Sequence, residues 1–148
     1  MLSPLFNQLL IPYIIAMFLA VTMGGSGTGP AFSAAYGANV IRKSLIPGIF
    51  GIMVFLGAIL AGKGTAETMG KDLLNPDLMN FTLVSIILFS VAISLLIANL
   101  FGIPQSTSQS SVLAISAAAL YYNQFNSNKV FLEIIPTWFI LPIISFFI

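Results

Sequence analysis

The stretch MGGSGTGPAFSAAYGAN, residues 23–39, decides how the chain can fold, because glycines, hydroxyl side chains and a proline crowd the path of a hydrophobic helix. Within the hydrophobic segment 5–23 before it, the apolar run from Leu9 to Met23 is slightly short for the roughly 20 residues that cross a bilayer. A helix from Leu9 to Ile41 would be about 50 Å long, well beyond a hydrocarbon core of about 30 Å. We therefore expect an interrupted helix, with a broken continuation over residues 28–41.

The composition places the rest of the chain in a membrane. Of the 148 residues 58% are hydrophobic and 6% are charged, and the mean hydropathy is +1.04. A soluble domain carries roughly a quarter charged residues. The sequence has neither Cys nor His, the usual sources of a thiolate nucleophile, a proton shuttle and most metal ligands. We predict an all-α integral membrane protein that is not an enzyme, with no catalytic residue, metal site or cofactor. A net charge of +1 also argues against nucleic acid as a partner.

Further hydrophobic segments extend outward from the opening stretch. They are residues 45–62, 81–101, 106–122 and 130–148. Five of the nine charges lie in the polar loop 63–80. Basic residues flank the segment 45–62 on both sides, so the sequence specifies the membrane orientation only weakly. We take residues 1–148 as one transmembrane unit with about five hydrophobic segments.

A second interruption is predicted in GIPQSTSQSSVLAISAAALYY, residues 102–122. Gly102 and Pro104 stop one helix, and the serines and threonine after them can cap the next. Non-helical backbone at membrane depth persists only where protein or water satisfies it, so two breaks suggest a shared polar cavity. Helix N-termini with exposed amides and hydroxyl groups suit an oxyanion. The candidate substrate-binding residues are Gly25, Ser26, Gly27, Thr28, Ser106, Thr107, Ser108 and Ser110. The alternative is that the small residues only let helices pack closely, as the spacing of Gly25 and Gly29 permits.

At these two motifs the chain resembles the inorganic phosphate transporter superfamily, and most closely its bacterial sulfate permease branch. GGSGTGPAFSAAYGANVIRKS is similar to the first motif of that branch, and LLIANLFGIPQSTSQSSV is similar to its second. The resemblance implies secondary active transport of an inorganic oxyanion in the cell inner (plasma) membrane, by a multi-pass protein. It also implies coupling to a cation gradient, with H⁺ or Na⁺ as the ion.

The same resemblance ranks the substrates. Phosphate members carry Gly-Ala-Asn-Asp at the first break, where their Asn falls on Ser26 and their Asp on Gly27. Their second motif, Ser-Thr-Thr-His-Ser, falls on residues 106–110, where the hydroxyls persist and Gln109 replaces His. Sulfate is fully ionised at neutral pH and only accepts hydrogen bonds, whereas phosphate carries protons that a carboxylate can accept. A site without a carboxylate therefore favours sulfate, and the missing Asp favours protons as the coupling ion.

The resemblance covers only the N-terminal half of a family member, which normally holds two inverted repeats around a midplane site. We expect one such half, with two interrupted or re-entrant helices. It would be completed either by a missing second repeat, an interpretation favoured by the apolar C-terminus, or by a second copy in the opposite orientation. Two other functions stay open: half of a phosphate symporter, and a structural or accessory membrane subunit that moves no solute.

Overall fold

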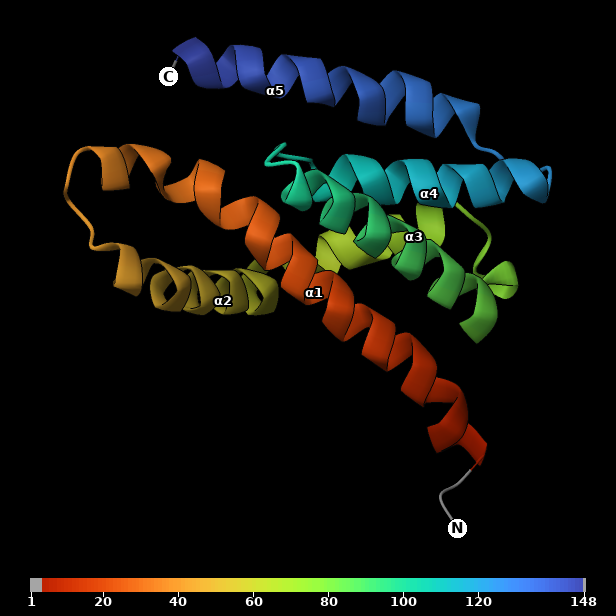
Figure 1. The fold of residues 1–148 in the computed structure, drawn as a ribbon. Helices are drawn as coiled ribbons and strands as arrows, with labels where there is room; N and C mark the ends of the chain where they lie inside the picture. The colour runs from red at the N-terminus through yellow and green to blue at the C-terminus, as the bar shows by residue number, and fades with distance from the viewer. Residues whose placement is uncertain (1–3, 148) are drawn as a thin grey trace.

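The computed structural model describes residues 4–147, which form helices joined by short connections (Figure 1). The main helices are α1 (Pro4–Gly37), α2 (Ile46–Glu67), α3 (Phe81–Leu100), α4 (Thr107–Tyr121) and α5 (Ile135–Phe147). Four stretches are long and apolar enough to cross a membrane: Gln8–Gly37, Lys43–Asp72, Phe81–Leu100 and Lys129–Phe147. The predicted all-α membrane class is confirmed. Residues 1–3 and 148 of the predicted unit lie outside the described part of the chain.

The predicted interruption in the first helix is wrong. Helix α1 continues through the glycine cluster and past Pro30, over 34 residues. Each glycine in a helix interior costs about 1 kcal/mol, whereas each backbone group left unpaired in an apolar medium costs several kcal/mol. The hydroxyl of Thr28 folds back and donates to the carbonyl of Gly24 at 3.1 Å. The unbroken helix is about 51 Å long, so it exceeds the bilayer core and must tilt or extend beyond it.

The second interruption is confirmed, and its local signals explain it. Helix α3 ends at Leu100, Gly102 after it has a left-handed φ of +68°, and the Ile103 amide donates to the Ala98 carbonyl at 2.9 Å. This is the hydrogen bond that closes many helix C-termini. Ser106 then begins α4, since its side chain accepts from the amide of Gln109. At 15 residues α4 is about 22 Å long, too short to cross the core, and it runs back beside α3 (Figure 1).

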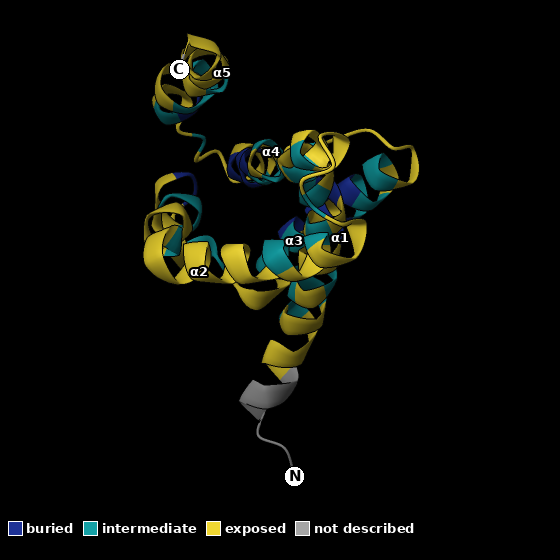
Figure 2. Cartoon of the chain, turned by 90° about the vertical axis from the view of Figure 1, so that its left-hand side faces the viewer, coloured by how far each residue is buried: buried dark blue, intermediate teal, exposed yellow. Residues whose placement is uncertain are grey.

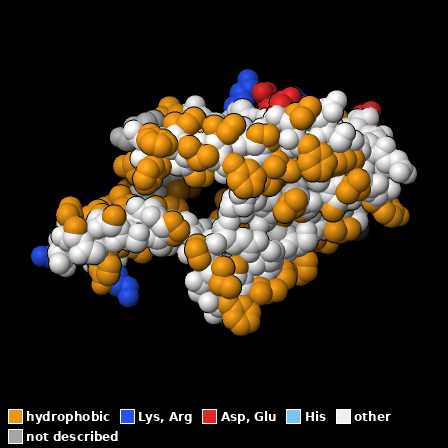
Figure 3. Space-filling model, turned by 90° about the horizontal axis from the view of Figure 1, so that it is seen from above, with side chains coloured by type: hydrophobic (Ala, Val, Ile, Leu, Met, Phe, Trp, Pro, Cys, Tyr) orange, Lys and Arg blue, Asp and Glu red, His pale blue; other side chains and the backbone are white. Residues whose placement is uncertain are grey.

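Two small cores hold the helices together. One joins α1 to α3 through Leu19, Val91, Ala92 and Leu95. The other packs α4 against the connection after α2 and the start of α5, through residues such as Leu74 and Val130. Helix α2 contains no buried residue, and Figure 2 shows it and α5 almost wholly exposed. Hydrophobic side chains cover much of the face in Figure 3, as expected where lipid rather than water is the neighbour.

Lys129 contacts one carboxylate in the segment after α2 and one in the turn before α5. Its ammonium lies 2.6 Å from the carboxylate of Glu133, four residues on, and 3.9 Å from that of Asp72. The predicted pair of Lys129 and Glu133 at a helix start is therefore present, within the π-helical turn Lys129–Ile134 that leads into α5. The longer contact, between Lys129 and Asp72, links the segment after α2 to the turn that leads into α5.

Candidate functional site

The site is built where α1 meets the connection between α3 and α4. Ser26 donates its hydroxyl to the backbone carbonyl of Gln105 at 2.9 Å. Asn99, in the last turn of α3, donates its side-chain amide to the carbonyl of Thr22 at 2.8 Å. Thr22 and Ser26 are one turn apart on α1, and both are buried. These two hydrogen bonds join α1 to the interruption from both sides.

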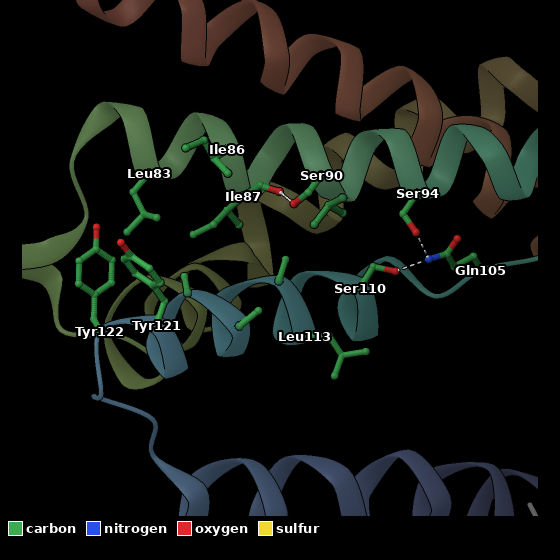
Figure 4. Close-up of a pocket in the computed structure, with 14 residues that line it drawn as sticks. Leu83, Ile86, Ile87, Ser90, Ser94, Gln105, Ser110, Leu113, Tyr121 and Tyr122 are labelled. Carbon is green, nitrogen blue, oxygen red and sulfur yellow. Dashed lines mark hydrogen bonds between the residues drawn. The ribbon is translucent and has the colours of Figure 1, made fainter.

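The side chain of Gln105 ties the ends of α3 and α4 together (Figure 4). Its amide nitrogen lies 2.7 Å from the hydroxyl oxygen of Ser94 on α3 and 2.7 Å from that of Ser110 on α4. Ser110 in turn donates to the carbonyl of Ser106 at 2.9 Å. We call Ser26, Ser94, Asn99, Gln105 and Ser110 the junction network.

The junction network lies between two open cavities. One, of about 600 Å³, is lined by Gly25, Ser26, Asn99 and the turn at Gly102. The other, of about 630 Å³, is a groove between α3 and α4 whose polar end is formed by Ser94, Gln105 and Ser110. Among the described residues that line either cavity, none is charged. The two cavities are therefore bordered by hydroxyl and amide groups, most of whose donors are used within the junction network, and by no carboxylate.

The structure separates the four candidate residues of α1. Gly25 and Ser26 face the junction, and a Cβ atom at Gly25 would lie 3.1 Å from the side-chain nitrogen of Asn99. Gly27 faces α2, since a Cβ atom there would lie 2.9 Å from the Phe50 ring. Thr28 lines a different cavity, between α1 and α2. The packing interpretation thus fits Gly25 and Gly27, where a glycine allows a close approach.

The four candidates around the start of α4 occupy one turn. Ser106 is the N-cap, Thr107 is half-buried and Ser108 is exposed. Ser110 belongs to the junction network. In capping α4, Ser106 uses an oxygen lone pair to accept the amide of Gln109, so its hydroxyl hydrogen can still be donated. Ser106 is therefore suited to donate to an oxyanion.

Sequence reasoning missed three members of the junction network: Ser94 on α3 and the two amide side chains of Asn99 and Gln105. The two amides lie within the second motif, where a single amide in an apolar run or beside a proline indicates little by itself. A buried polar side chain at membrane depth needs a partner, and that requirement could have pointed to Asn99. Among the described residues, no cluster of three or more acidic side chains could hold a metal ion.

The interrupted α3 and α4, with the hydroxyl-rich turn between them, lie in the part of the chain that is similar to known proteins. A model of the phosphate transporter family matches residues 23–148, which include both motifs and the whole junction network. The chain belongs to the phosphate transporter family. Its match covers α2 to α5 and α1 from Met23 onward.

Curated relatives of this family member include both sulfate and phosphate permeases by name. It is 31% identical to the sulfate permease CysP of Bacillus subtilis over 134 residues, which cover 90% of this chain and 38% of the relative. It is 32% identical over 145 residues to a protein of Thermococcus kodakarensis named a putative phosphate permease, covering 93% of this chain and 36% of the relative. The chain therefore spans little more than a third of the length of these relatives. No solved structure matches it.

Proposed function

We propose that the chain is one half-unit of a permease that carries an inorganic oxyanion across the membrane, with sulfate preferred to phosphate. The observation that carries the proposal is the junction network. An uncharged set of hydroxyl and amide groups is held at a helix interruption and opens into two cavities. Membership of the phosphate transporter family supports anion transport as the class of activity.

The preference for sulfate rests on charge and hydrogen-bonding type. Sulfate presents only acceptors, and the hydroxyls of Ser106 and Thr107 at the start of α4 are donors that can meet them. The positive end of the α4 dipole lies at the same place. A carboxylate that could accept a phosphate proton is absent from the described lining of both cavities. A relative named a sulfate permease is consistent with this choice.

Three further features belong to the same proposal. Transport is secondary and driven by a cation gradient, with protons favoured over sodium because Gly27 stands where phosphate members of the family carry Asp. The chain resides in the cell inner membrane. It works with a second repeat or a second copy of itself, since the relatives are much longer than this chain.

Uptake of radiolabelled sulfate and phosphate into proteoliposomes tests the proposal. The chain is reconstituted, its assembly is verified by size-exclusion chromatography, and a proton or a sodium gradient is imposed separately. Ser106→Ala and Thr107→Ala are each expected to lower sulfate uptake about tenfold, because a hydrogen bond to a charged group contributes about 1.5–3 kcal/mol. Thr137→Ala is the matched control, since that hydroxyl lies on α5 and donates to the carbonyl of Ile134, in the turn just before α5.

Two results would count against transport at this site. One is an assembled protein that takes up neither anion under either gradient. The other is sulfate uptake that Ser106→Ala and Thr107→Ala leave at the level of the Thr137→Ala control. Either result would favour the alternative, an accessory membrane subunit in which the junction network only holds α1 against α3 and α4.

A further inference from the structure

A third cavity, of about 430 Å³, lies on the α2 side of α1, and it shares Gly29 and Ser33 with the cavity beside the junction network. Its lining residues are Thr28, Gly29, Phe32, Ser33, Tyr36, Lys43, Ile46 and Pro47. The lining is amphipathic: it combines one ammonium group and three hydroxyl groups with an aromatic ring and aliphatic carbon. Nothing in the proposed transport site uses Lys43 or Tyr36.

The contact between α1 and α2 explains why the cavity is there. Phe32 of α1 and Phe50 of α2 pack edge to face with their ring centres 6.3 Å apart. Phe50 also occupies the space above Gly27. Of this aromatic pair, Phe32 lines the cavity. After α1 the chain turns at Asn39, which has a φ of +56°, and brings Lys43 to the start of α2.

The cavity is open and lies at the end of two membrane-capable helices. Five of its eight lining residues are exposed, Tyr36 and Lys43 among them. Candidate spans end at Gly37 and begin again at Lys43, so the cavity borders the polar connection between two membrane-capable helices. Arg42 adds a second positive charge next to Lys43. In Figure 3 basic side chains stand at the end of the molecule where Figure 1 places this connection.

We propose that this cavity binds the headgroup and the first acyl carbons of one anionic phospholipid. Lys43 pairs with the lipid phosphate, and the hydroxyls of Ser33 and Tyr36 can donate to its ester and phosphate oxygens. Phe32 and Ile46 contact the acyl chain, which continues along the exposed apolar surface of α2. A free oxyanion would match Lys43 but would leave the apolar half of the lining without a partner. The amphipathic lining therefore favours a lipid over a free ion.

Native mass spectrometry of the full chain in detergent tests this assignment. The protein is titrated with phosphatidylglycerol or with zwitterionic phosphatidylcholine, both with the same acyl chains. We expect tighter binding of phosphatidylglycerol, and we expect Lys43→Gln to weaken it about fivefold, as for one basic residue beside an anionic headgroup. Lys43→Arg keeps the charge and should retain the binding. Lys63→Gln is the matched control, because Lys63 is an exposed lysine near the opposite end of α2.

The outcomes separate the lipid from the other occupants. Equal effects of Lys43→Gln and Lys63→Gln would overturn the site, and so would equal binding of the two lipids. Millimolar sulfate or inorganic phosphate could also displace phosphatidylglycerol to the same extent in Lys43→Gln and in Lys63→Gln. That result would overturn the site too, because the ions would then weaken lipid binding by general screening of charge and not by competing at Lys43. Displacement in the wild-type chain that Lys43→Gln abolishes would replace the lipid by a free oxyanion. Because none of these measurements involves transport, they stand whether or not sulfate uptake is observed.

Discussion

Removing the two hydrogen bonds that join α1 to the interruption should loosen the fold by a calculable amount. Ser26→Ala deletes the donor to the Gln105 carbonyl, and Asn99→Ala deletes the donor to the Thr22 carbonyl. A typical intramolecular hydrogen bond contributes about 0.5–1.5 kcal/mol net, and more when the abandoned partner stays buried. Ser26 is only 8% exposed, so its loss should cost about 1 kcal/mol or slightly more. The double variant should lose about 2 kcal/mol if the two bonds act independently.

Thermal unfolding in detergent micelles measures this loss. The single tryptophan, Trp138, packs against the core that includes α4, so its fluorescence reports the unfolding of the bundle. For a chain of this size about 1 kcal/mol corresponds to a Tm shift of roughly 2–4 °C. We therefore expect a fall of that size for each single variant and about twice as much for Ser26→Ala combined with Asn99→Ala. A double-mutant cycle then gives the coupling between the two bonds.

Ser85→Ala is the control for these measurements. Its hydroxyl donates to the Phe81 carbonyl of the same helix at 2.7 Å and joins no two elements. The change should leave Tm within a degree of the wild-type value. If Ser26→Ala lowers Tm no more than Ser85→Ala does, the hydrogen bond to Gln105 does not hold α1 to the interruption, and the argument for a built junction fails.

Three further substitutions test separate features of the helices by the same unfolding measurement. Gly102→Ala should lower the free energy of unfolding by roughly 1–2 kcal/mol, since nothing crowds a Cβ atom there but the left-handed φ of +68° strains any other residue. Ser116→Ala should raise stability by up to about 1 kcal/mol, because the buried Ser116 hydroxyl has no hydrogen-bond partner among the described residues. Gly24→Ala should also raise it by up to about 1 kcal/mol, because Gly24 lies in a continuous helix with nothing within 4 Å of an added Cβ atom. A loss of stability in Gly24→Ala would show that α1 does bend at its glycine cluster.

The sequence allowed the interruption between α3 and α4 to be predicted because its causes are local. A glycine that takes a left-handed φ, a proline two residues later and a serine that caps the next helix act within a few residues of one another. The glycine cluster of α1 is different, because the same residues are compatible with a break or with close packing. What decides between them lies far along the chain: Asn99 contacts α1 over 77 residues of separation, and Phe50 comes from α2. Such partners cannot be found from the composition of residues 23–39.

Because α1 is continuous, its residues Ser26 and Gly27 contribute less to the proposed sulfate site than the sequence suggested. A side chain at position 27 points toward Phe50 of α2, so the missing carboxylate at Gly27 says little about the junction itself. The hydroxyl hydrogen of Ser26 is already donated to the Gln105 carbonyl, which leaves its oxygen as an acceptor. The donors that remain for an oxyanion are therefore at the start of α4, with Ser106 first among them. The proposed preference for sulfate then rests on these donors and on the uncharged described lining of the two cavities beside that turn, and α1 contributes by holding the turn in place.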